Sequence, residues 1–239
     1  YVSPIAIAYN LPSVKEDIKM DAETVAKVFA GEIKKWNDEA IAADNEGADL
    51  PDTDIHVIFR SDESGTSDNF QKFLSASTGK WDGEGKQFPD SVGEGANGSS
   101  GVADQVANIE GAITYVEAGF ADQKEADGVK KAKIDFGNGP VELTGESAGK
   151  AVSAAKTAGE GNDLQLEMQY KNTPKDVYPA VLVTYEIACS SGNKNADVLK
   201  DFLSFYASQD EQKKIQDLGY APLPTDVSKK ALDSAQAIS

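Results

Sequence analysis

The stretch VIFRSDESGTSDNFQKFL, residues 57–74, contains the pattern that decides the fold class. A short apolar run ends at an arginine, small and polar residues follow, and an amphipathic segment then begins. The apolar side chains of the second segment recur at helical spacing, whereas the first run has the length and composition of a buried strand. The pattern predicts a strand over 55–59 and a helix over 64–77, joined as the β-turn-α unit of an α/β fold.

The turn between this strand and this helix has the chemistry of a small-anion site. The first turn of a helix carries unpaired backbone N–H groups and the positive end of the helix dipole. Ser64 and Thr66 can add hydroxyl donors, and Gly65 lets an anion approach the backbone without a Cβ in the way. Arg60 offers a planar set of donors that suits a tetrahedral oxyanion, and Asp62 can orient it through a salt bridge.

The same residues are also compatible with an ordinary surface turn. Ser64 is a common type of helix N-cap, Arg60 and Asp62 can form an exposed ion pair, and Gly65 can be incidental. The residues alone leave both interpretations open. In either case the acidic chain repels a free anion at long range, so an anion site would have to work through short-range contacts.

Apolar runs alternate in a similar way along the rest of the chain. Strands are expected at 5–9, 112–116, 129–136 and 181–188, and helices after Asp21 and at 101–110, 145–158 and 197–206. Residues 79–101 are rich in Gly, Ser and Asp and predict a long loop, and the polar stretch 160–177 predicts a linker between two lobes. The alternation predicts an α/β fold with a parallel or mixed sheet.

Composition is that of an ordinary globular protein and excludes several classes of function. The 239 residues are 40% hydrophobic and 26% charged, and 23 basic against 40 acidic side chains give a net charge of −17. A field of that sign repels nucleic acid and anionic membrane surfaces, so no nucleic-acid partner is expected. No segment has the length of a membrane-spanning helix, and no Cys/His cluster has metal-ligand spacing, so neither a metal nor another cofactor is expected.

Three features that look like chemical sites are interpreted as structural. A nucleophilic serine near His56 would need that base within hydrogen-bond reach and an orienting acid, so His56 is interpreted as an ordinary strand residue. Cys189 ends an apolar run and is interpreted as a core residue. The Gly-rich run 93–101 lacks the Gly-Lys-Ser/Thr ending of a phosphate loop and is interpreted as a loop leading to a helix N-cap. The alternative is that Ser99 or Ser100 faces a cleft between the two lobes.

Five segments, taken in order along the chain, resemble the phosphate-binding proteins of bacterial phosphate ABC transporters, the PstS type. They are Ile-Ala-Ile-Ala-Tyr-Asn-Leu-Pro at 5–12, Val-Phe-Ala-Gly-Glu-Ile-Lys-Lys-Trp-Asn-Asp-Glu-Ala-Ile at 28–41, Arg-Ser-Asp-Glu-Ser-Gly-Thr at 60–66, Gly-Val at 101–102 with Gly-Ala-Ile-Thr-Tyr-Val-Glu at 111–117, and Tyr-Pro at 178–179 with Thr-Tyr at 184–185. Each piece alone is weak, but the combination is specific and runs over nearly the whole chain.

The resemblance implies a two-lobe periplasmic-binding-protein fold of a type II-like class, with an anion in the cleft between the lobes. Residues 1–172 would form a complete second lobe, which carries the anion motif. Residues 173–239 would supply the C-terminal part of the first lobe, as a strand followed by helices.

The resemblance also assigns roles to the residues of the turn. Arg60, Ser64, Gly65 and Thr66 would be phosphate ligands, and Asp62 would be the partner that orients Arg60. No catalytic residue is implied. The implied function is an extracytoplasmic protein that delivers inorganic phosphate to the membrane permease of an ABC importer. Its implied place is the cell envelope, either in the periplasm or lipid-anchored to the outer face of the cytoplasmic membrane.

One departure from the family pattern concerns the start of the chain. Family members carry an N-terminal section before the strand at 5–9, and that section forms most of the first lobe and supplies further ligands. The resemblance therefore implies an N-terminally truncated chain. The apolar faces of residues 178–239 are then expected to need cover, through self-association, rearrangement or local disorder.

Other functions fit the same residues. A phosphate-ester hydrolase would use Ser64 as its nucleophile, and turnover of a chromogenic phosphate ester would reveal it. A surface sensor or adhesion module, or a binder of another oxyanion, would keep the fold and change the role. Competition by sulfate or molybdate against phosphate would separate the oxyanions.

Overall fold

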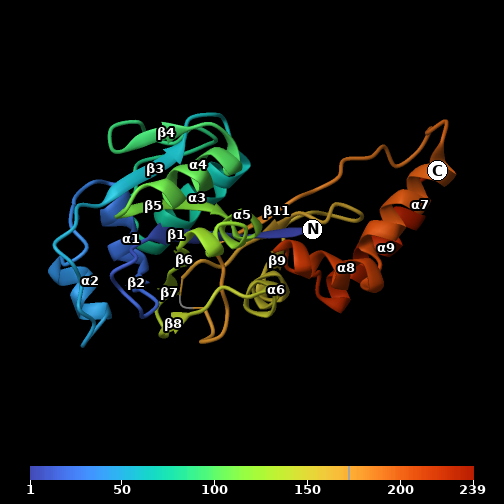
Figure 1. The fold of residues 1–239 in the computed structure, drawn as a ribbon. Coiled ribbons are helices and arrows are strands. Elements are labelled where there is room, and N and C mark those ends of the chain that lie inside the picture. Colours follow the sequence, from blue (N-terminus) through green and yellow to red (C-terminus); the bar gives the residue numbers. More distant parts are fainter. Residues whose placement is uncertain (172) are drawn as a thin grey trace.

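A six-stranded mixed sheet forms the centre of the computed structural model, which describes residues 1–171 and 173–239 (Figure 1). Its strands are β1 (Val2–Asn10), β3 (His56–Arg60), β4 (Glu94–Ala96), β5 (Ala112–Glu117), β6 (Val129–Lys131) and β11 (Val181–Val183). The order is β11-β1-β5-β3-β4, and β6 also pairs with β1. β1 runs antiparallel to β5, β6 and β11, whereas β3 is parallel to β4 and β5, as the expected mixed sheet requires.

Two smaller sheets lie beside the main one. They consist of β2 (Lys19–Asp21), β7 (Lys133–Asp135) and β8 (Pro140–Val141), and of β9 (Lys156–Thr157) and β10 (Leu166–Glu167). The single strand expected over 129–136 is therefore wrong in detail. Its first part pairs with β1 and its second part pairs with β2. The strand is therefore interrupted at the buried Ala132, which lies between the two parts.

Helices fill the connections between the strands. They are α1 (Ala22–Phe29), α2 (Glu39–Asp44), α3 (Gly65–Thr78), α4 (Gly98–Asn108), α5 (Ala118–Asp122), α6 (Gly145–Ala154), α7 (Ala196–Ala207), α8 (Gln209–Lys214) and α9 (Thr225–Gln236), with 3-10 turns η1 (Glu125–Asp127) and η2 (Ile215–Leu218). The predicted N-cap Asp21 is confirmed, because its carboxylate accepts the Thr24 N–H at 2.6 Å. The loop expected over 79–101 is partly wrong, since it contains β4 and the first turn of α4.

The main core surrounds β1, every residue of which is buried. Trp36 is fully buried and its indole N–H donates to the Gly111 carbonyl at 3.0 Å, which satisfies the one polar atom of that ring. Phe70 of α3 stacks on Tyr115 of β5 with ring centroids 4.5 Å apart. This contact fixes α3 against the sheet and so determines where the start of α3 lies.

The C-terminal helices lie apart from the main sheet and pack on one another (Figure 1). The strand expected over 181–188 ends at Val183, which pairs with Val2 in the last pair of the β1–β11 ladder. Ile187 is consequently 99% exposed, and Cys189 is exposed rather than in the core, so both expectations for this stretch are wrong.

A second, smaller apolar cluster joins this C-terminal part to the rest of the protein. It contains Val2, Ala148, Val152, Val181 and Ala221, and Ala221 pairs with Val2 through an isolated β-bridge. The boundary expected between residues 172 and 173 falls at the one residue outside the described part of the chain. The division into lobes therefore stays a prediction.

Candidate functional site

The carboxyl ends of three parallel strands meet at one edge of the main sheet. Arg60 ends β3 and Glu117 ends β5, while β4 ends at Ala96 and leads directly into α4, which carries Ser99 in its first turn. Because β3 is parallel to both β4 and β5, these ends lie side by side. In α/β sheets this edge is where ligands are usually bound. We call the segment from the end of β3 to the first turn of α3 the 60–66 turn.

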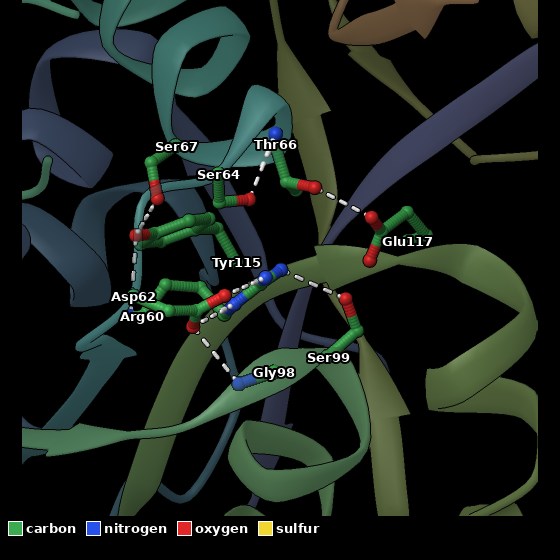
Figure 2. Close-up of polar contacts among 9 residues, drawn as sticks. All are labelled: Arg60, Asp62, Ser64, Thr66, Ser67, Gly98, Ser99, Tyr115 and Glu117. Atoms are coloured by element: carbon green, nitrogen blue, oxygen red, sulfur yellow. Dashed lines mark hydrogen bonds and ion pairs between the residues drawn. The ribbon is translucent and has the colours of Figure 1, made fainter. Parts of the chain in front are cut away.

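Arg60 is held on two sides by fixed acceptors (Figure 2). Its Nε and Nη2 donate to the two carboxylate oxygens of Asp62 at 2.8 and 2.6 Å, and its Nη1 donates to Ser99 Oγ at 2.9 Å. Its side chain is only 10% exposed. A guanidinium has five N–H donors, so two remain for another acceptor once the described partners are counted. The geometry presents a pre-oriented cation rather than a mobile surface arginine.

Asp62 is itself fixed by the backbone that follows β4. Its Oδ1 also accepts the Gly98 N–H at 2.9 Å, so three donors converge on one carboxylate. The hydrogen bonds from Arg60 are the main reason that the pKa of Asp62 lies well below its usual value. The same hydrogen bonds raise the pKa of Arg60 above its usual value. Asp62 therefore carries a full charge throughout the neutral range.

The start of α3 supplies further donors beside Arg60. Ser64 is the N-cap, as predicted, and its Oγ accepts the Thr66 N–H at 3.0 Å, which leaves its hydroxyl proton to donate elsewhere. Gly65 has ordinary helical backbone, and a Cβ placed there would meet only Leu182, at a normal contact distance of 3.6 Å. Neither backbone conformation nor packing among the described residues thus requires a glycine at this position.

The Thr66 side chain contacts Glu117 in the ligand-free structure, and its role as an anion ligand stays a prediction. Its hydroxyl donates to Glu117 Oε1 at 2.5 Å, although the sequence pattern suggested a donor to an anion. Glu117 Oε2 is buried and has no hydrogen-bond partner among the described residues. The next residue of α3, Ser67, shares a 2.6 Å hydrogen bond with the Tyr115 hydroxyl and is fully buried. Figure 2 shows these contacts together at the start of α3.

The structure brings all five residues predicted for the site to this one edge: Arg60, Asp62, Ser64, Gly65 and Thr66. That they bind an anion stays a prediction. Sequence reasoning missed Glu117, and it favoured a loop leading to a helix N-cap for the run that contains Ser99. Both residues follow parallel strands next to β3, so knowledge of the strand order would have pointed to them.

His56 lies too far from Ser64 to act as its base. It is exposed at the first residue of β3, whereas Ser64 follows the last. A strand rises about 3.3 Å per residue, so the length of β3 alone separates them by roughly 13 Å. Among the described residues no group of three or more His, Cys, Asp or Glu side chains has metal-binding geometry. In the same part of the chain no helix combines the length and apolar character that crossing a membrane requires.

Comparison with known proteins places the chain in one family. The model of the PBP superfamily domain matches residues 1–210. Two solved structures have a matching fold. A high affinity periplasmic phosphate-binding protein has a TM-score of 0.72 and 22% identity, and the match covers 95% of this chain and 68% of that one. A human phosphate binding apolipoprotein has a TM-score of 0.71 and 19% identity, and the match covers 95% of this chain and 69% of that one. The expected α/β periplasmic-binding-protein fold is confirmed.

Relatives of higher identity are longer than this chain. Phosphate-binding protein PstS 3 of Mycobacterium leprae is 42% identical over 242 residues, covering 99% of this chain and 65% of the relative. Phosphate-binding protein PstS 2 of Mycobacterium tuberculosis has the same identity and coverage, and PstS of Xylella fastidiosa is 32% identical over 95% of this chain and 64% of the relative. The chain thus spans less than two thirds of their length. These relatives are phosphate-binding proteins by name.

Proposed function

We propose, because this chain belongs to the PBP superfamily, that it binds inorganic phosphate and delivers it to the membrane permease of a phosphate ABC importer, as a PstS-type protein. The proposal rests on the position of Arg60, which is held by hydrogen bonds to Asp62 and Ser99 beside the start of α3. The extracytoplasmic location, in the periplasm or lipid-anchored in the cell envelope, is part of the same proposal.

Phosphate capture would use three kinds of donor at the 60–66 turn. Arg60 would contribute its two remaining N–H groups as charge-assisted hydrogen bonds, which are short and strong. The Gly65 N–H and the hydroxyls of Ser64 and Thr66 would contribute neutral hydrogen bonds at the positive end of the α3 dipole, that of Thr66 in place of its hydrogen bond to Glu117. Asp62 would keep Arg60 in place without touching the ligand, so little ordering entropy would be lost on binding.

The two lobes would close over the bound ion. Residues 1–172 would form the lobe that carries the 60–66 turn, and residues 173–239 part of the other lobe. Leu182 of β11, which belongs to the second range, is the side chain nearest to a Cβ placed on Gly65, so residues of both ranges lie close to the 60–66 turn.

An apolar face on α7 supports self-association as a further part of this proposal. Val198, Phe202, Phe205 and Tyr206 are between 49% and 70% exposed on this one helix. Patches of this kind on a globular protein usually mark a contact surface. A second copy of the chain packing on this face, which we call the α7 face, would cover it.

Calorimetric titration of phosphate into the 239-residue chain and its Arg60→Ala variant tests the proposed site. Two charge-assisted hydrogen bonds, at about 1.5 kcal/mol or more each, predict an affinity loss of roughly 100-fold or greater. Lys80→Ala is the matched control, because Lys80 is 74% exposed and its removal changes the net charge by the same amount. The control should bind as the unsubstituted chain does.

Two results would count against the proposal. Equal affinity in the unsubstituted chain and in Arg60→Ala would remove the site from the 60–66 turn. Binding of sulfate or molybdate in place of phosphate would keep the site and change the ligand.

A further inference from the structure

Ser99 contacts the Arg60 guanidinium from an element other than the 60–66 turn. It lies in the first turn of α4, and its Oγ accepts a hydrogen bond from Arg60 Nη1 at 2.9 Å. Figure 2 shows Ser99 and Asp62 on different sides of the guanidinium. The next residue, Ser100, is exposed, so Ser99 is the better placed of the two serines at the start of α4 to meet a ligand of Arg60.

The hydrogen bond from Arg60 determines what the Ser99 hydroxyl can offer. A serine hydroxyl has one proton to donate and two lone pairs that accept. The Arg60 N–H occupies a lone pair and leaves the proton available, and no acceptor for that proton is found among the described residues. Ser99 is half-buried at the edge of the sheet where the proposed phosphate site lies. An anion held by Arg60 is well placed to supply the acceptor.

The remaining N–H of Arg60 Nη1 and the Ser99 hydroxyl are spaced for one polyatomic anion. The two hydrogens of Nη1 point about 120° apart, so an acceptor on the second hydrogen would lie roughly 5 Å from Ser99 Oγ. No single atom can accept hydrogen bonds from both groups across that separation. A tetrahedral oxyanion can, because one of its oxygens can accept from Nη1 while a neighbouring oxygen accepts from Ser99.

We infer that Ser99 is a further ligand of the proposed phosphate site and donates its hydroxyl proton to a second oxygen of the anion that Arg60 binds. The inference rests on the proposed function. The bound anion would then lie between the first turns of α3 and α4, which follow the neighbouring parallel strands β3 and β4. This role differs from one in which Ser99 only positions Arg60, because Asp62 already holds two nitrogens of the guanidinium.

Calorimetric titration of phosphate into Ser99→Ala tests the inference. The loss of one hydrogen bond to a charged group predicts binding about tenfold weaker than in the unsubstituted chain. Ser100→Ala is the matched control, because it removes an exposed hydroxyl from the same turn of α4. The control should bind phosphate as the unsubstituted chain does.

Amide and side-chain N–H spectra of the chain before phosphate is added separate a ligand from a positioning residue. The Arg60 Nε–H signal reports on the hydrogen bond to Asp62 and so on the orientation of the guanidinium. In Ser99→Ala this signal should keep its position, because Asp62 holds the guanidinium through Nε and Nη2 without help from Ser99. Weaker phosphate binding together with an unmoved Arg60 signal is the expected combination.

Three results would overturn the inference. They are an unchanged phosphate affinity in a folded Ser99→Ala, an equal loss of affinity in Ser100→Ala, and a displaced Arg60 Nε–H signal in Ser99→Ala, which would make Ser99 a positioning residue. Ser99→Gly removes the same hydroxyl and takes the place of Ser99→Ala if that variant does not fold. Failure of the unsubstituted chain to bind phosphate would overturn the proposed function together with this inference, whereas the three results overturn the inference alone.

Discussion

Replacing Asp62 with asparagine tests whether the Arg60 side chain is held in advance of ligand binding. Asp62 accepts hydrogen bonds from Arg60 Nε, Arg60 Nη2 and the Gly98 N–H. An asparagine keeps one acceptor oxygen and turns an NH₂ group toward these donors, so at least one charge-assisted hydrogen bond is lost. Such bonds contribute about 1.5–3 kcal/mol each. Because the Asp62 side chain is 29% exposed, solvent screening favours the lower part of that range, about 2 kcal/mol.

The expected loss of about 2 kcal/mol corresponds to a Tm lower by roughly 4–8 °C for a chain of this size. The free energy of unfolding from urea titrations measures it directly. Asp52→Asn is the control, because Asp52 is 71% exposed and its partner Lys35 keeps a second contact with Asp54. The control should stay within about 0.5 kcal/mol of the unsubstituted chain. Phosphate affinity of Asp62→Asn should also fall, by about tenfold, as Arg60 loses its fixed orientation.

The pH dependence of this difference carries a definite sign. The pKa of Asp62 is lower in the folded chain than in the unfolded chain, so its contribution to stability is complete above the unfolded value of about 4. This contribution is lost as the pH falls from about 4 toward the lower pKa that Asp62 has in the folded chain. The difference between Asp62→Asn and the unsubstituted chain should therefore be smaller at about pH 3 than at pH 7. A variant as stable as the parent at pH 7, or a difference that does not shrink in acid, would refute this reasoning.

Two further predictions concern the α7 face and the buried tyrosines. Light scattering should show the chain as an oligomer at micromolar concentration. The double variant Phe202→Ser, Phe205→Ser should be a monomer, because those two rings are more than half exposed and would form the contact. If the unsubstituted chain is a monomer, self-association is removed from the proposal. Burial raises the pKa of Tyr9, Tyr115 and Tyr170 to about 12, so the stability they contribute is complete below about pH 10 and is lost as the pH rises toward 12. The tyrosinate absorbance of these three rings and the loss of circular dichroism should then rise together above pH 10. Ionisation of the three rings in a chain that stays folded would contradict the prediction that their burial raises the pKa.

Local sequence patterns predicted the elements that carry the site. The apolar run before Arg60 forms β3, and Ser64 caps α3, because both depend on side chains within a few residues of one another. The strand β4 could not be predicted in this way. Its sequence Glu-Gly-Ala has no strand pattern, and it forms because it pairs with β3, where a Cβ on the preceding Gly93 would come within 2.1 Å of the Val57 carbonyl.

Contacts between distant segments account for the rest of what the sequence did not reveal. Glu117 and Ser99 reach the 60–66 turn only through the parallel order of β3, β4 and β5, which no local pattern encodes. The early end of β11 has a similar origin, because an apolar run becomes a strand only where a partner strand is present. Ile187 lies beyond the last paired residue of β11 and is exposed.

The central claim, that phosphate binds at the 60–66 turn, is tested most directly by amide correlation spectra of the isotope-labelled chain during a phosphate titration. The predicted result is a set of saturable shifts at the Gly65 amide, the Arg60 side-chain N–H groups and the Ser99 amide, with little change at the distant His56. Shifts that appear elsewhere, or none at phosphate concentrations in the millimolar range, would contradict the claim.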